Sequence, residues 1–105
     1  MHGPAQQMNS IEDLLHLLHS DGADALRLSV RRPPIVVLDG EDQALEGPAV
    51  TIEDADQILQ SLANSRQRRT LRASGSVEFI HTFRQSASFV VHARIEGETV
   101  EINIH

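Results

Sequence analysis

The sequence has no cysteine, and its 105 residues include no lysine, tryptophan or tyrosine. Without cysteine, a disulfide scaffold, a thiol nucleophile and a zinc–thiolate site are excluded, and a reducing compartment is compatible with the chain. Without lysine, there is no P-loop lysine, no Schiff base and no lysine general base. Three phenylalanines are the only aromatic residues, so surfaces for stacking bases or sugars are scarce.

Basic charge and long apolar runs are also scarce. The net charge of −6 argues against a nucleic-acid or anionic-membrane surface. No apolar run approaches the ~20 residues of a membrane span, and residues 1–10 lack the basic end and apolar centre of a signal peptide. We therefore expect a cytoplasmic protein with a disordered lead-in at 1–9 and a single domain at 10–105.

Three helices are predicted from apolar spacing and capping residues. The first spans Ser10–Ser20, with Ser10 as its cap and Gly22 as a left-handed stop. The second follows the cap Thr51 over about 52–62, and the third follows Ser65 as far as Leu71 or Ala73. The residues that we expect to be buried on the first two helices are Ile11, Leu14, Leu15, Leu17, Leu18, Ile52, Ala55, Ile58, Leu59 and Leu62.

Alternating apolar residues predict strands on both sides of the last two helices. Before them, we expect strands at 25–30, at 35–39 (apolar on both sides and thus central) and near 43–45, with Asp39-Gly40 as a hairpin turn. After Gly75, three strands follow as an antiparallel meander, with a turn at 96–98. The predicted order is α-β-β-β-α-α-β-β-β, an α+β fold with helices packed on a sheet.

Histidines offer few candidates for chemistry. His16 and His19 lie three apart on the first helix, with Glu12 four residues before His16, but the spacing supplies no third or fourth metal ligand, so we expect solvated residues. His81 lies on the apolar face of its strand, where we expect a hydrogen-bonded core residue or a polar group in a pocket. His92 should face the other side of the sheet. We expect no catalytic, metal or cofactor site.

Charged clusters are the remaining candidates. The acidic run Asp39, Glu41 and Asp42 lacks the order of oxygen ligands in an EF-hand, so we expect a solvated turn. No glycine-rich phosphate loop is present. Arginines crowd the third helix, and within an acidic protein they are the best candidates for docking an acidic partner, although a solvated helix face is the alternative. They are Arg66, Arg68, Arg69 and Arg72.

Several motifs together resemble the N-terminal domain of the type IV pilus twitching (retraction) ATPases. The resemblance covers about residues 10–104, and its most specific part runs from Arg32 to Ala55. The motifs are Leu28-x-Val30, Arg32-Pro33-Pro34, Leu38-Asp39-Gly40-Glu41, Leu45-x-Gly47-Pro48, Thr51-x-Glu53-Asp54 and Ile58-Leu59, followed by Gln67, Leu71, Gly75, Glu78 and Phe79. The resemblance implies a PAS-like domain that, in the family, precedes a RecA-like ATPase domain and packs on a neighbouring subunit of a hexameric ring.

The chain departs from the family at positions that matter. Arg31 replaces the usual glycine before Arg-Pro-Pro, which demands a different backbone if that glycine has a positive φ. The family's arginine-rich fifth strand is Ser88-Phe89-Val90-Val91-His92 here, with Arg94 nearby. No Walker motif is present. We therefore expect a stand-alone fold that lacks the residues with which the family binds and hydrolyses nucleotide.

These patterns lead to an expected function that is not enzymatic. We expect a protein-interaction module that docks on a pilus or type II secretion ATPase, or that self-associates through an exposed edge strand. The alternative is a PAS-like ligand sensor, with small residues at Ala87, Ser88 and Ala93 and the polar His81 near Phe79 and Phe83. A small enzyme would require His81 or His92 to meet a carboxylate or serine in a cleft.

Overall fold

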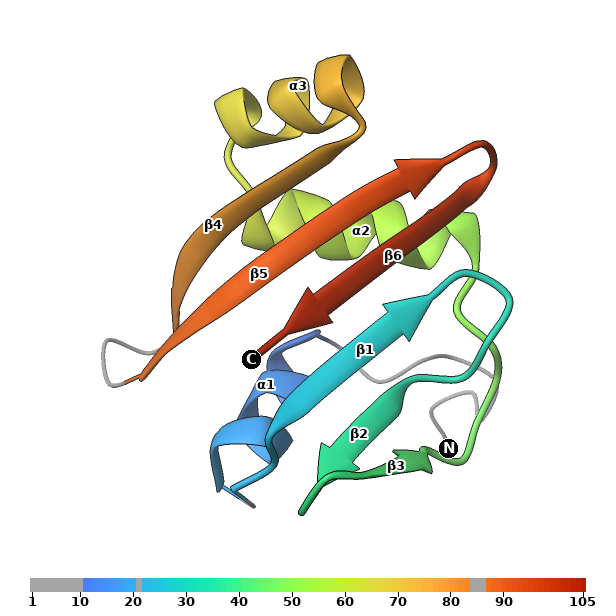
Figure 1. Ribbon diagram of the computed structural model, residues 1–105, viewed down its shortest axis with the longest axis vertical. Coiled ribbons are helices and arrows are strands. Elements are labelled where there is room, and N and C mark those ends of the chain that lie inside the picture. Colours follow the sequence, from blue (N-terminus) through green and yellow to red (C-terminus); the bar gives the residue numbers. More distant parts are fainter. Residues whose placement is uncertain (1–10, 21, 84–86) are drawn as a thin grey trace, which may run out of the picture.

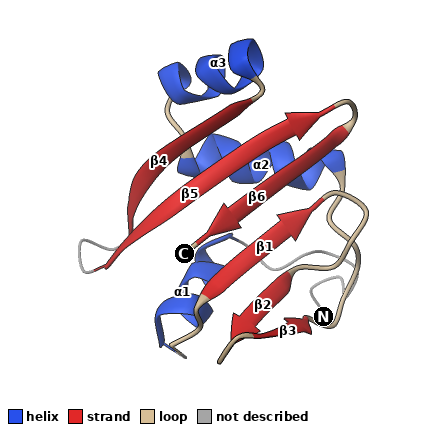
Figure 2. Cartoon of the chain, viewed as in Figure 1, coloured by secondary structure: helices blue, strands red, loops and turns tan. Residues whose placement is uncertain are grey.

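The computed structural model describes residues 11–20, 22–83 and 87–105, so the predicted lead-in at 1–9 and the cap Ser10 lie outside them. The described chain forms an α+β domain in the predicted element order (Figures 1 and 2). Its elements are α1 (Ile11–Ser20), β1 (Ala25–Ser29), β2 (Ile35–Leu38), β3 (Glu41–Ala44), α2 (Ile52–Leu62), α3 (Ser65–Ser74), β4 (Ser76–Phe83), β5 (Ala87–Glu96) and β6 (Thr99–Ile104).

All six strands form one sheet in the order β3-β2-β1-β6-β5-β4, with antiparallel pairing between neighbours. The first and last strands meet in the middle, where Leu26 pairs with Ile104 and Leu28 with Ile102. This pairing joins the N-terminal β1–β2–β3 unit to the C-terminal meander. The β2 strand pairs with β1 on one side and with β3 on the other, so it is an interior strand, second from the edge.

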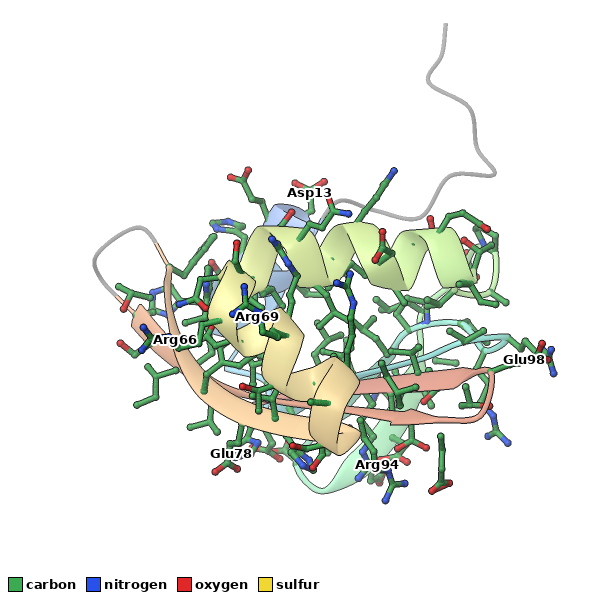
Figure 3. All side chains as sticks on the ribbon, turned by 90° about the horizontal axis from the view of Figure 1, so that it is seen from above. Asp13, Arg66, Arg69, Glu78, Arg94 and Glu98 are labelled. Carbon is green, nitrogen blue, oxygen red and sulfur yellow. The ribbon has the colours of Figure 1, made fainter. Side chains whose placement is uncertain are left out.

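The helices cover one face of the sheet, and the other face is open. Figure 3 shows α1 and α2 on one side, with Glu78 and Arg94 projecting from the opposite side. The apolar stripes of the two helices meet the inward residues of the strands, as the alternation predicted. The largest fully buried side chains are Leu14, Leu15, Leu26, Leu28, Val50, Val91, Ile102 and Ile104.

Capping residues set where α2 and α3 begin. The Thr51 side chain accepts from the N–H of Asp54, whose carboxylate accepts from the N–H of Thr51, as predicted. For α3, Asn64 and Gln67 make the same reciprocal pair, so the predicted cap Ser65 is wrong by one residue. An asparagine carbonyl serves this role as well as a hydroxyl does.

The hairpin between β2 and β3 forms at the predicted place but is tighter than expected. Asp39 and Gly40 both have positive φ, 52° and 80°, as a type I′ turn requires. Leu38 then pairs directly with Glu41, so β3 begins at Glu41. The predicted start near Gln43 is wrong, and only Asp39 of the acidic run belongs to the turn.

Burial on α2 differs from the prediction at one position. Ile52 is 49 % exposed, although the helical period places it on the buried stripe. It is the first residue of α2, where it lines a groove together with Ile95 and Val100 of the sheet. Among the helices of the described residues, none is long and apolar enough to cross a membrane.

Candidate functional site

The arginine-bearing helix α3 is held in place by apolar contact and by its caps. Leu71 is buried against the core, and Gly75 ends the helix in the left-handed conformation with φ of 86°. Leu71 fixes one side of α3 against the core, and the arginines lie on the other sides of this helix. Figure 3 shows Arg66 and Arg69 on it.

Arg68 makes hydrogen bonds within the domain. Its guanidinium donates to the carbonyl oxygens of Gln60 (3.4 Å) and Ala63 (3.2 Å), and to the hydroxyl of Ser65 (3.4 Å). Carbonyls at the end of a helix lack intrahelical partners, so a cation there stabilises the end of α2. Of the four arginines predicted to dock a partner, this one has an internal role.

The other three arginines, Arg66, Arg69 and Arg72, form what we call the arginine surface. Their side chains are exposed and make no ion pair or side-chain hydrogen bond with any residue the structure describes. No acidic residue occurs in α3 to neutralise them. Arginines elsewhere do find carboxylates, as Arg27 does at 3.0 Å from Asp42. The arginine surface is thus a local concentration of free positive charge on an acidic protein.

An apolar groove of about 100 Å³ adjoins the arginine surface between α2, α3 and the sheet. Its lining combines apolar side chains with three charged ones: Ile52, Leu59, Leu71, Ile95 and Val100, together with Asp56, Arg68 and Arg72. Sequence reasoning missed this groove because the period of α2 predicted a buried Ile52. A hydrophobic residue at the first position of a helix, beyond the reach of the core, was the available signal.

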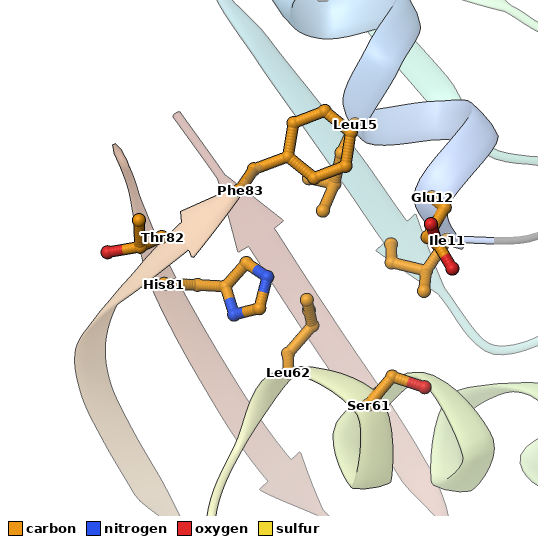
Figure 4. A pocket seen from close by; sticks show the side chains of 8 residues that line it. All are labelled: Ile11, Glu12, Leu15, Ser61, Leu62, His81, Thr82 and Phe83. Carbon is orange, nitrogen blue, oxygen red and sulfur yellow. The ribbon is translucent and has the colours of Figure 1, made fainter. Parts of the chain in front are cut away.

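A second cavity, of about 270 Å³, lies between α1, the end of α2 and the end of β4. Figure 4 shows the His81 imidazole directed into it, with the Glu12 carboxylate and the Ser61 hydroxyl on the other side. Apolar side chains make up the rest of the lining. His81 is half-buried, and its ring makes no hydrogen bond with any described residue. The expected hydrogen-bonded core histidine is therefore wrong, and the polar group in a pocket is what the structure shows.

The small residues expected beside His81 do not line this cavity. Ala93 is fully buried in the core, and Ser88 is exposed on the face of β5 opposite to Phe89. Only His81 and Phe83 of the predicted lining are present. The cavity lies at the end of β4, beside α1 and the end of α2.

The remaining histidines are dispersed. His92 pairs with Glu78 on the open face, away from His81 as predicted. On α1, the Nε2 atom of His16 lies 3.3 Å from the hydroxyl of Ser20. Within residues 11–20, 22–83 and 87–105, no three His, Cys, Asp or Glu side chains gather as a metal site would require.

With helices on one face of the sheet and a first–last strand pair at its centre, the chain has the fold of one part of larger ATPases. A crystal structure of the pilus retraction motor PilT with bound ADP superposes with a TM-score of 0.81 at 23 % identity, over 92 % of this chain. The Legionella pneumophila ATPase DotB gives 0.79 at 13 % over 98 %, and the Yersinia pseudotuberculosis ATPase DotB gives 0.70 at 14 % over 99 %.

The chain spans only 29–31 % of the length of these three ATPases. At such identities the likeness shows a shared fold, and it confirms at that level the predicted resemblance to the twitching ATPases. No protein-family model matches the chain, and no curated protein matches its sequence.

Proposed function

We propose that the chain is a non-catalytic interaction module that docks an acidic protein surface in the cytoplasm. The arginine surface carries this proposal, because three exposed guanidinium groups have no partner among the described residues. Each guanidinium offers planar donors that match a carboxylate in a bidentate pair. A partner with Asp or Glu side chains would supply the missing acceptors.

The groove beside the arginine surface narrows the kind of partner. Interfaces combine an apolar centre with a polar rim, and Arg is enriched in them. The apolar floor formed by Leu59, Leu71, Ile95 and Val100 provides the centre, and the charged side chains of the lining, Asp56, Arg68 and Arg72, provide the rim. We propose a segment with an apolar side chain flanked by carboxylates as the occupant. The shared fold makes a pilus retraction or type II secretion ATPase the first partner to test.

The test mixes the purified chain of 105 residues with each purified pilus or secretion ATPase of the same cell. We expect a complex on size-exclusion chromatography that weakens as salt is raised, because exposed charges are screened over about 10 Å at 0.1 M salt. Absence of a complex with every one of these ATPases would overturn the docking proposal.

A second candidate function, binding of a small ligand, is favoured by the cavity at His81. At about 270 Å³ it is close to the lower end of ligand pockets, which begin at roughly 300 Å³. An apolar body would contact Ile11, Leu15 and Leu62, and a basic group would face Glu12. Benzylamine has both features. NMR shifts of Leu62 and His81 on titration, reduced in Glu12→Gln, would support this function, whereas equal shifts in both proteins would argue against it.

A further inference from the structure

The two edges of the sheet differ in how well they are protected against pairing. The β3 edge has four residues, all exposed, and carries the carboxylates of Glu41 and Asp42. Short length and charge are the usual devices that prevent an edge from pairing with another chain. The β4 edge has eight residues, no proline and a single charged residue, Glu78. The β4 strand is thus the unprotected edge.

An exposed hydrophobic residue marks the middle of the β4 edge. Ile80 is 69 % exposed, more than Ile52, the other large hydrophobic residue exposed in the described chain. It lies on the open face of the sheet, opposite to the buried Phe79. Its neighbour across the β4–β5 pair is Val90, which is half-buried. The β4 edge therefore combines free backbone groups with an apolar pair, and both would be covered by one further strand.

We infer that β4 pairs antiparallel with β4 of a second copy of this chain, across a two-fold axis at Ile80. In this register Ile80 lies opposite Ile80, and Glu78 lies opposite Thr82 of the second copy. An axis at Glu78 would place the two Glu78 carboxylates opposite each other, which is destabilising. An axis at Phe79 would place Glu78 against Ile80. Only the axis at Ile80 joins the apolar side chains and separates the charges.

The charge of the chain and the length of the edge set the strength of this pairing. Each copy has a net charge of −6, so the copies repel each other at low salt. The contact centres on residues 78–82, because α3 lies beyond the start of β4 (Figure 1). So short an edge buries less than the ~1,200 Å² of a standard stable interface. The dimer is consequently weak, and added salt strengthens it.

The inference rests on the proposed role as an interaction module, but it uses a separate surface. Self-association through β4 strengthens with salt, while docking of an acidic partner on the arginine surface weakens with salt. A failure of one can therefore be recognised independently of a failure of the other. At a salt concentration that screens its added negative charge, Arg69→Glu should leave the dimer unchanged.

Sedimentation velocity of the full chain over a wide concentration range tests the inference. We expect a reversible monomer–dimer equilibrium whose Kd rises at least about tenfold in Ile80→Lys. The matched control is Ile52→Lys, which changes the other exposed isoleucine and should leave Kd unchanged. Thr82→Lys should lower Kd, because the new ammonium would face Glu78 of the second copy.

The Kd values are compared only between variants whose circular dichroism spectra match the spectrum of the original chain, because a matching spectrum shows that the fold is retained. A chain that stays monomeric at every concentration and salt would overturn the inference. So would a dimer that Ile80→Lys leaves intact, or one that only Ile52→Lys abolishes, since the association would then run through the groove beside α2.

Discussion

The backbone N–H of Arg31 donates a hydrogen bond of 2.7 Å to the carbonyl oxygen of Val50, and Arg31 holds a φ of 76° to do so. The N–H of Val50 in turn donates at 2.8 Å to the carbonyl oxygen of Arg32. These bonds join the end of β1 to the residue before the cap of α2, and Val50 is fully buried. The left-handed residue thus anchors the loop that leads into α2.

From the resemblance to the twitching ATPases, an arginine here was expected to demand a different backbone if the glycine it replaces has a positive φ. Arg31 itself adopts the left-handed conformation, so a positive φ at this position does not require glycine. Such a conformation costs an L-residue about 1–2 kcal/mol. The hydrogen bonds of Val50 and the surrounding loop maintain it against this cost.

Arg31→Gly should therefore raise the free energy of unfolding by about 0.5–1 kcal/mol, since relief of strain exceeds the added chain entropy of glycine. The lost ion pair with Glu98, 3.9 Å away and mostly exposed, contributes little. Urea unfolding measures the change. Arg32→Gly is the control and should destabilise, because φ is not positive there. A destabilised Arg31→Gly would show that the conformation carries no strain.

Thr51→Ala should lower the free energy of unfolding by about 1 kcal/mol, because the N–H of Asp54 loses its acceptor at the start of α2. Ser61→Ala is a matched control, since it removes an exposed hydroxyl, which donates to the carbonyl oxygen of Gln57, from the last turn of the same helix. We expect Ser61→Ala to be neutral or slightly stabilising. Equal losses in both variants, measured by urea unfolding, would contradict a specific capping role.

Arg68→Ala and Arg66→Ala should separate the structural arginine from the free ones. Arg68→Ala removes donors from the carbonyl oxygens of Gln60 and Ala63, and we expect a loss of about 1 kcal/mol in urea unfolding. Arg66→Ala removes an exposed side chain without a partner in the described chain, so the change should stay within about 0.5 kcal/mol. A reversed order would refute these assignments.

Arg69→Glu should weaken binding of a pilus or secretion ATPase about tenfold or more, because a carboxylate would replace a guanidinium facing acidic residues. Isothermal titration calorimetry at two salt concentrations provides the Kd. The stability of the domain should not change, since Arg69 is exposed on α3.

Arg32→Glu is the control for this experiment. It makes the same change of charge at an exposed arginine in the loop between β1 and β2, a residue that does not line the groove. We expect its Kd to remain near that of the original chain. An equal loss in both variants would indicate a response to net charge and would contradict docking on the arginine surface.

Much of the fold could be predicted from short-range signals. The period of Leu14, Leu15 and Leu18 on α1, the pair Thr51 and Asp54, and the turn Asp39-Gly40 each specify local structure through contacts within a few residues. Such contacts join residues that lie close together in the sequence, so a local pattern is enough to predict them. The open face of the C-terminal meander followed in the same way from alternation of apolar residues.

The candidate sites depended on distances that no local pattern encodes. In the sequence, nothing distinguished the four arginines of α3 from one another. The end of α2 lies beside Arg68, so Arg68 binds carbonyl oxygens there, while the other three arginines have no partner among the described residues. His81 faces a cavity that residues of α1, of the end of α2 and of the end of β4 line together, although these segments are far apart in the sequence.

The sequence by itself determined the class of fold, the order of its elements and the absence of cysteine and lysine chemistry in this chain. The tertiary structure decided which strands became edges, which arginines remained unpaired and which isoleucines stayed exposed. The physical reason is the range of the forces involved: capping, turns and periodicity act between near neighbours, whereas burial and charge pairing depend on which distant segments the sheet brings together.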